Sequence, residues 1–249
     1  MMQPPIFIIN MDGCEDRWQA TYTRLKEVGL NATRFPATNG KQLSEPEVTK
    51  WYDPAANFKR YHRHLTPGEI GCYISHYRVC EKVVNEKLPY ALVLEDDLHI
   101  EDSLAPLLAL VPDLNNWDMI KLSDNRANPF IDTLKLSDQF TLGNYKKVPN
   151  GTQGYLISLA GAKKLLSRKP FYRPVDVDLQ FHSETGLQVT GIKPYPVSED
   201  VNFESEIATM NKGQHSGRST FTRNAKHRIR LFLQRQFRSA TLKDISDIC

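Results

Sequence analysis

The run of residues that limits the fold most is an apolar segment of strand length ending in three consecutive acids, Ala91 to Leu98 (ALVLEDDL). A short, continuously hydrophobic segment is typical of a parallel strand that is buried on both faces. In open α/β sheets, ligands bind just outside the carboxyl ends of such strands. The run therefore predicts an α/β fold with Glu95, Asp96 and Asp97 at the ligand-binding edge of the sheet.

The three acids also indicate a chemistry. Successive strand residues point to opposite faces, so we expect Glu95 and Asp97 on one side of the strand and Asp96 on the other. Two carboxylates on one side suit a hard divalent cation, Mg²⁺ or Mn²⁺, whose other ligands are often water and substrate phosphates. We therefore expect a metal at Asp97 and Glu95 and a nucleotide diphosphate as partner. An acidic strand exit that is merely solvated fits the spacing equally well.

Length and charge predict one domain followed by a tail. The chain has 249 residues, enough for one large α/β domain, and its 40% hydrophobic and 24% charged residues are ordinary for a soluble globular protein. The net charge of +3 is unevenly spread, because residues 212–249 hold nine lysines and arginines against two aspartates. We expect a domain over residues 1–211 and a basic tail over residues 212–249.

The tail contains an amphipathic pattern. Ile229, Phe232, Leu233 and Phe237 recur at helical spacing, and four arginines lie among them, namely Arg228, Arg230, Arg235 and Arg238. The pattern predicts a basic amphipathic helix. Such a helix either lies on an anionic membrane surface or docks on the protein's own body with its arginines in water, and the sequence leaves both open.

Several classes of protein are disfavoured. No apolar run is long enough to span a membrane, and the start of the chain lacks the positive charge of a secretory signal, so we expect a cytoplasmic protein that is at most peripheral on the inner membrane. The four cysteines form no CxxC pair, which favours reduced thiols and no zinc site. GxGxxG and P-loop motifs are absent. A nucleic-acid binder would rest on the basic tail alone, so we expect no nucleic-acid partner.

Two further segments hold candidate residues. Thr66 to Glu69 (TPGE) reads as a capping box that begins a helix, whose positive end could approach a phosphate near Gly68 or serve only as a cap. Ser75 and His76 lie inside that helix, where a lone histidine is more often packed than a ligand. Asp176 and Asp178 lie on one side if the segment Arg173 to Leu179 is extended, and are otherwise turn formers or caps.

Taken in order, the motifs resemble glycosyltransferase family 25, the lipooligosaccharide galactosyltransferase group. The matching segments are Ile8 to Asp12 with Arg17, Arg34 to Ala37, Leu65 to Cys72 with Ser75 and His76, Leu92 to Asp97, Gly151 to Ser158, and Pro174 to Asp176. The resemblance implies a GT-A-like, Rossmann-type single domain with a mixed, mostly parallel sheet. It also implies transfer of a hexose with inversion, most often galactose from UDP-galactose, to a lipooligosaccharide or lipopolysaccharide glycan.

The resemblance further implies roles for residues. Asp97 would hold the metal, and Glu95, which replaces the first Asp of an Asp-X-Asp motif, would contact the metal, its water or the ribose. The donor would be held by Asn10, Asp12, Arg17, Gly68, Ser75, His76, Glu95 and Asp96. The base would be Asp176 or Asp178, with Glu199 and Asp200 as weaker candidates. The alternatives are a UDP-glucose-dependent glucosyltransferase and a non-catalytic protein that binds nucleotide sugars or glycans.

Overall fold

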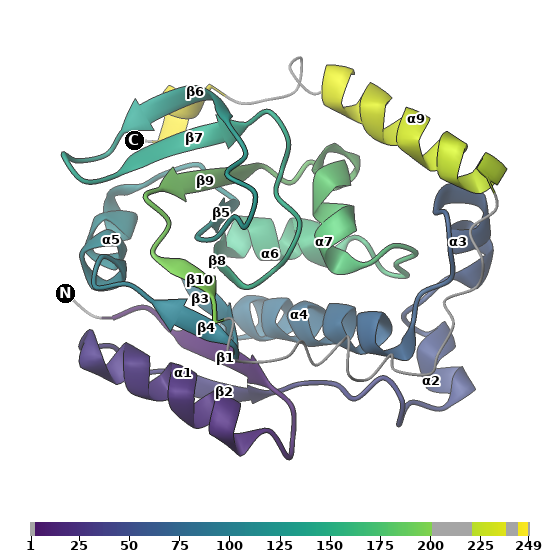
Figure 1. Ribbon diagram of the computed structural model, residues 1–249, viewed down its shortest axis with the longest axis horizontal. Helices are drawn as coiled ribbons and strands as arrows, with labels where there is room; N and C mark the ends of the chain where they lie inside the picture. Colours follow the sequence, from purple (N-terminus) through teal and green to yellow (C-terminus); the bar gives the residue numbers. More distant parts are fainter. Residues whose placement is uncertain (1–2, 201–220, 238–243, 249) are drawn as a thin grey trace.

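The computed structural model describes residues 3–200, 221–237 and 244–248, and its centre is an eight-stranded sheet with helices on both faces (Figure 1). The strand order is β2-β1-β3-β8-β5-β9-β7-β6. The strands are β1 (Ile6–Asn10), β2 (Thr33–Pro36), β3 (Tyr90–Glu95), β5 (Met119–Lys121), β6 (Phe130–Lys135), β7 (Thr141–Tyr145), β8 (Gly154–Ser158) and β9 (Val189–Lys193).

The sheet is mixed, and most of its strands share one direction. β1 pairs in parallel with both β2 and β3, and β5 pairs in parallel with β9. β8 is antiparallel to β3 and β5, while β7 is antiparallel to β9 and β6. Only β8 and β7 therefore run against the other strands. This confirms the predicted α/β fold with a mixed, mostly parallel sheet.

Both faces of the sheet are covered, which explains the uninterrupted apolar run in β3. Ala91 and Val93 pack in a core with α4 (Pro67–Asn85) and α6 (Leu159–Leu166). Leu92 and Leu94 pack in a second core with α1 (Glu15–Glu27) and α5 (Leu104–Leu110). A strand between two apolar layers needs hydrophobic residues at every position. The polar residues begin where β3 leaves these layers, at Glu95.

The elements that remain between these helices and strands are short. They are α2 (Glu45–Thr49), α3 (Pro54–Arg60), η1 (Val111–Asp113), α7 (Val175–Asp178), η2 (Leu179–Thr185) and a separate ribbon of β4 (Leu98–Ile100) and β10 (Val197–Glu199). The segment holding Asp176 and Asp178 is thus a helical turn, so the extended conformation considered for it is wrong. Residues two apart on a helix point in different directions. The two aspartates accordingly have different surroundings.

The predicted capping box is confirmed and fixes the first turn of α4. The Thr66 hydroxyl accepts a hydrogen bond from the Glu69 N–H at 3.3 Å, and the Glu69 carboxylate accepts one from the Thr66 N–H at 2.9 Å. Gly71 allows the helix to lie against the chain after β2, since a Cβ there would be 2.3 Å from the Thr38 carbonyl oxygen. The N-terminal half of α4 is therefore held close to the sheet edge.

Two segments beyond residue 211 pack on the body. Helix α9 (Phe221–Phe237) lies beside α3 (Figure 1). The short η4 (Ile245–Ile248) buries Ile245 and Ile248 in the core of the α1 face. Residues 212–220 and Arg238 of the predicted tail lie outside the described residues. Within the described ranges, no helix combines the length and the apolar character needed to cross a membrane.

Candidate functional site

A pocket of about 280 Å³ lies at the carboxyl end of β3, the edge predicted to bind a ligand. It is bounded by β3, by the loop that precedes β8, by α4 and by α7. Its lining residues are Glu69, Cys72, Glu95, Gly151, Thr152, Gln153, Pro174, Val175 and Asp176. The pocket thus brings Glu95 and Asp176 together from segments eighty residues apart in the sequence.

Helix α4 supplies one wall because of its residue spacing. Glu69, Cys72 and His76 follow one another at i, i+3 and i+7, which places them on one face of the helix. His76 is buried below the pocket, where its Nδ1 lies 2.9 Å from the Tyr155 hydroxyl and its Nε2 lies 3.6 Å from the Glu95 carboxylate. His76 is therefore packed, as is usual for a histidine within a helix, and it also supports a residue of the pocket.

Glu95 is held as a carboxylate. The Thr152 hydroxyl donates a hydrogen bond to its Oε1 at 2.6 Å. Burial pushes the pKa of Glu95 upward, but the contacts with His76 and Thr152 outweigh burial and leave the pKa below its ordinary value. Because it is charged and only partly covered, Glu95 can face a cation or a donor hydroxyl in the pocket.

Asp176 has the properties of a proton acceptor. Burial raises its pKa, although backbone N–H groups of Val177 and Gly151 partly offset that rise. A carboxylate with a raised pKa is better matched to a proton transfer near neutral pH. Asp176 lies in the pocket, and Asp178 does not line it.

Lys121 is a site residue that sequence reasoning missed. It is fully buried at the end of β5, and its ammonium donates to the carbonyl oxygens of Pro149 at 3.0 Å and Gly151 at 2.6 Å. Burial lowers its pKa to about 8, and the charge of Asp176 acts in the opposite direction. Lys121 thus shapes the loop that carries Thr152 and places a cation behind the pocket. The one signal in the sequence was a charge inside an apolar strand.

Beyond the end of β3, Asn10 of β1 and Arg17 of α1 form a buried charge network with Asp96 and Asp97. Arg17 donates to Asp96 Oδ1 through Nε at 3.0 Å and Nη2 at 2.6 Å, and Nη2 also lies 3.0 Å from Asp97 Oδ2. The Asn10 amide donates to Asp96 Oδ2 at 2.6 Å. β3 ends at Glu95, so the strand alternation stops there, and Asp96 and Asp97 share one guanidinium instead of pointing to opposite faces.

Asp97 keeps one oxygen available. Its Oδ1 is buried and has no hydrogen-bond partner among the residues that the structure describes. Burial, followed by the negative charge of Glu95, raises the pKa of Asp97 to about 6, against the lowering effect of Arg17. A buried carboxylate beside other acids is costly unless a cation neutralises it. These features fit a hard divalent ion at Asp97 with Glu95 beside it.

A second donor set lies close by. Ligand atoms of Cys72, His76 and Glu95 all lie within 4.8 Å of one another, a combination of thiol, imidazole and carboxylate that sequence spacing did not reveal. Thiolate and imidazole suit a softer ion than Mg²⁺. Burial raises the pKa of the Cys72 thiol well above its ordinary value, which disfavours the thiolate form that binds metals. The oxygen donors at Asp97 and Glu95 therefore fit a metal better.

Other predicted site residues lie away from the pocket. Asp178 is buried between Tyr73, Arg168 and Arg173, with its closest contacts at 2.7, 2.8 and 2.6 Å. Ser75 links α4 to the chain after β2, since its hydroxyl accepts from the Thr38 N–H at 2.8 Å. Both have structural partners that account for their burial.

The remaining predicted site residues also lie outside the pocket. Gly68 is buried in the first turn of α4, and Asp12 is exposed and pairs with Arg34 at 3.0 Å. Glu199 is exposed, and its carboxylate accepts a hydrogen bond from the Asn125 amide at 2.9 Å. Asp200 is buried; its carboxylate pairs with Arg24 at 2.5 Å, and its N–H donates to the Asp97 carbonyl at 2.8 Å. None of these four lines the pocket at Glu95.

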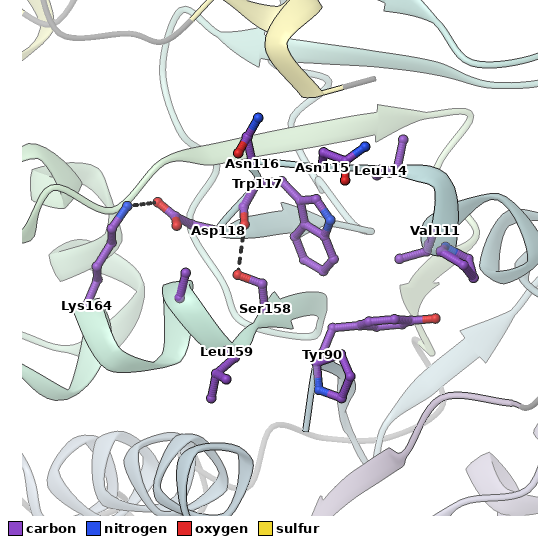
Figure 2. Close-up of a pocket in the computed structure, with 13 residues that line it drawn as sticks. Tyr90, Val111, Leu114, Asn115, Asn116, Trp117, Asp118, Ser158, Leu159 and Lys164 are labelled. Atoms are coloured by element: carbon purple, nitrogen blue, oxygen red, sulfur yellow. Dashed lines mark hydrogen bonds and ion pairs between the residues drawn. The ribbon is translucent and has the colours of Figure 1, made fainter. Parts of the chain in front are cut away.

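A larger pocket, of about 460 Å³, lies at the opposite edge of the sheet and differs in chemistry (Figure 2). The Asp118 carboxylate there meets the Lys164 ammonium at 2.6 Å and the Gln188 N–H at 2.8 Å. The Ser158 hydroxyl donates to the Trp117 carbonyl at 2.8 Å. Its charged groups, Asp118 and Lys164, are already paired with each other, so the smaller pocket at β3 is the better candidate for catalysis.

Comparison with known proteins identifies the family of this chain. The sequence pattern of glycosyltransferase family 25, described as an LPS biosynthesis protein, matches residues 3–179. The chain belongs to glycosyltransferase family 25. The match contains the β1 exit, the capping box, the acidic run and Asp176, together with the residues that line the pocket at Asp118.

Relatives of this family 25 chain occur among animal proteins. A glycosyltransferase 25 family member of Aedes aegypti is 34% identical over 184 residues, which are 70% of this chain and 29% of the relative. Procollagen galactosyltransferase 1-B of Xenopus laevis is 33% identical over 195 residues, covering 70% and 30% of the two chains. The family 25 chain thus spans about a third or less of the length of these curated relatives.

Among solved structures, a Drosophila β-1,4-galactosyltransferase 7, determined with manganese, UDP-Gal and xylobiose, has a TM-score of 0.40 and 10% sequence identity to this chain. The alignment covers 91% of this chain and 80% of that one.

Proposed function

We propose that this family 25 glycosyltransferase transfers a hexose from a UDP-sugar to a glycan hydroxyl, with inversion and with the help of a divalent cation. The observation that carries the proposal is the grouping of acids at the end of β3. Glu95 and Asp176 line one pocket, and Asp97 follows two residues later with a buried oxygen that lacks a partner among the described residues. These groups match the two needs of sugar transfer, charge neutralisation and proton removal.

Each residue has a defined part in the proposed reaction. Asp97, with Glu95 beside it, would hold Mg²⁺ or Mn²⁺, which acts as a Lewis acid on the leaving diphosphate. Arg17 bridges Asp96 and Asp97 and holds both carboxylates in place. Asp176 removes the proton from the acceptor hydroxyl as the new bond forms on the face opposite the leaving group.

For the donor we propose UDP-galactose, and for the acceptor a lipooligosaccharide or lipopolysaccharide glycan. The family's description as an LPS biosynthesis protein and the name of the Xenopus procollagen galactosyltransferase support these two choices. UDP-glucose remains the alternative donor, because glucose and galactose differ in the orientation of one hydroxyl.

A screen of UDP-sugars tests the proposal. The full chain is incubated with UDP-galactose, UDP-glucose or UDP-N-acetylglucosamine and a deacylated lipooligosaccharide, with Mn²⁺, with Mg²⁺ or with EDTA, while UDP release and product anomeric configuration are measured. We expect metal-dependent release that is fastest with UDP-galactose and a β-linked product. An α-linked product would refute inversion, and a faster reaction with UDP-glucose would replace the donor.

A non-catalytic sugar-nucleotide binder is the second candidate, and one observation favours it. Arg17 already provides Asp97 with a counter-charge at 3.0 Å, which reduces the need for a metal. Calorimetry with each UDP-sugar separates the two functions. Donor binding with no UDP release for any acceptor or metal would support the binder and reject the enzyme.

A further inference from the structure

Helix α9 is attached to the body through its polar side. The Arg223 guanidinium donates to the Tyr61 carbonyl at 3.2 Å, and that of Arg230 donates to the Lys59 carbonyl at 2.9 Å. The Gln234 amide contacts the Ser183 hydroxyl in η2. Positions 223, 230 and 234 lie on one side of a helix. The anchoring side of this amphipathic helix is therefore its hydrophilic one.

The opposite side of α9 is apolar and faces outward. Phe221 is 88% exposed, Ile229 and Phe232 are each 58% exposed, and Leu233 is 44% exposed. Within the described residues, these are four of the six large hydrophobic side chains that are exposed. With Ala225 they form one stripe, because their spacing follows the helical repeat. Docking by its polar side has thus concentrated exposed apolar surface on α9.

Positive charge borders this stripe. Lys226 and Arg228 are exposed on its two flanks, and no acid occurs between Phe221 and Phe237. A cleft of about 650 Å³ separates α9 from α3, and its lining includes Phe58 and five cations, Lys59, Arg60, Arg223, Lys226 and Arg230. Phe58 is itself 60% exposed. The surface therefore offers apolar side chains beside cations that an anionic headgroup can reach.

We propose that the outward face of α9, together with the basic cleft beside α3, binds the surface of a membrane that carries anionic lipids. An apolar stripe flanked by lysine and arginine is the pattern of helices that lie in the plane of a membrane interface. A second copy of the chain is a poorer occupant, because two α9 helices would bring cations against cations with no acid from either helix. Lipid phosphates supply the missing negative charge.

The location of α9 gives the proposal a functional sense, which rests on the proposed function. Ser183 of η2, the contact of Gln234, lies a few residues after Asp176, so membrane attachment would hold a glycolipid acceptor on the side of the molecule that carries the base. The binding test below contains no UDP-sugar. A chain that binds vesicles and shows no turnover would fail only the proposed function.

Vesicle flotation of the full chain tests the membrane face. The probes are vesicles of phosphatidylcholine alone and of phosphatidylcholine with phosphatidylglycerol. We expect binding to the anionic vesicles only. Ile229→Gln with Phe232→Gln removes two exposed apolar groups and should weaken binding at least about tenfold. Lys226→Gln with Arg228→Gln should weaken it about 25-fold, at roughly fivefold per cation.

A matched control replaces an exposed hydrophobic residue elsewhere. Ile131 in β6 is 51% exposed, and Ile131→Gln should bind anionic vesicles like the wild type. Circular dichroism and thermal melting establish that each variant is folded. Failure of the wild type to bind, or equal binding of the Ile229 and Phe232 double variant, would overturn the proposal. The proposal would also be overturned if the wild type were a dimer, the double variant were a monomer and neither bound vesicles. A second copy of the chain would then cover the face.

Discussion

Each end of the sheet contains a buried aspartate, but the two aspartates differ in how fully their negative charge is compensated. At the edge where β5 begins, Asp118 is buried and pairs with the Lys164 ammonium and the Gln188 N–H. At the carboxyl end of β3, Asp97 is also buried and pairs with Arg17, yet its other oxygen lacks a described partner and its pKa is raised to about 6. Charges that are compensated by a counter-charge stabilise a fold, whereas a buried acid with a raised pKa and an unsatisfied oxygen marks a candidate ligand site.

Charge on neighbouring groups strengthens this contrast. At the β3 end, burial raises the pKa of Asp176 and lowers that of Lys121 to about 8, so an acid and a base both depart from their ordinary behaviour within one small region. Of the pockets at the two ends of the sheet, the one at Asp118 is the larger, so volume would have favoured it over the pocket at Glu95. The comparison teaches that unsatisfied charge is a better guide to this site than cavity size.

The largest effect is expected from Asp97→Asn, which should remove nearly all turnover. An amide is a weak metal ligand and carries no charge to balance a cation, so several kcal/mol of transition-state stabilisation is lost. UDP release with UDP-galactose is the measurement, and the wild type should likewise lose activity in EDTA and regain it with Mn²⁺. Full wild-type activity in excess EDTA would remove the metal from the mechanism and weaken the contrast between the two ends.

The next effect concerns the base. Asp176→Asn should lower kcat about 100 to 10,000-fold while leaving donor affinity nearly unchanged, because general-base assistance acts only in the transition state. The matched control is Asp178→Asn, since that carboxylate is buried among Arg168, Arg173 and Tyr73. It should cost about 3 to 5 kcal/mol of unfolding free energy, as expected for a broken buried ion pair. Nearly unchanged kcat in Asp176→Asn would move the base elsewhere.

Local signals in the sequence predicted the parts of this site that depend on neighbours along the chain. The apolar run before Glu95 and the capping box at Thr66 each lie within a few residues, and both are confirmed. Asp178 could not be separated from Asp176 in the sequence. Its burial depends on Tyr73 in α4, a hundred residues earlier, and a helix of four residues is too short to show a periodic pattern.

The surroundings of the charged groups also depended on residues that are distant in the sequence. Lys121 appeared in the sequence only as one cation in an apolar strand, because the carbonyl oxygens that hold it come from the loop at Pro149 and Gly151. The predicted alternation of Glu95, Asp96 and Asp97 failed where β3 ended, since only a paired strand imposes it. The amphipathic pattern predicted α9, but which side would face the body depended on partners in α3 and η2.

A smaller effect is expected from Glu95→Gln, with kcat falling about tenfold. The amide can still accept the hydrogen bond of Thr152, but the negative charge that raises the pKa of Asp97 is removed. Asp97 would then ionise more readily, which offsets part of the lost metal contact. Activity measured against Mn²⁺ concentration checks this, with Thr152→Ser as a control that keeps the hydroxyl. A loss as large as that of Asp97→Asn would make Glu95 an equal metal ligand.

The smallest effect on turnover is expected at the opposite end of the sheet. Asp118→Asn leaves Lys164 without its counter-charge but preserves an oxygen that can accept from the Gln188 N–H. Lys164 is 32% exposed and can turn toward water, so the unfolding free energy should fall by about 1 to 3 kcal/mol. Denaturant melts measure this loss. The kcat of the folded enzyme should stay within about twofold, because Asp118 lies at the opposite end of the sheet from the proposed catalytic acids with shifted pKa values. If Asp118→Asn lowered kcat as much as Asp176→Asn at unchanged stability, the larger pocket would belong to the active site and the contrast between the two ends would be wrong.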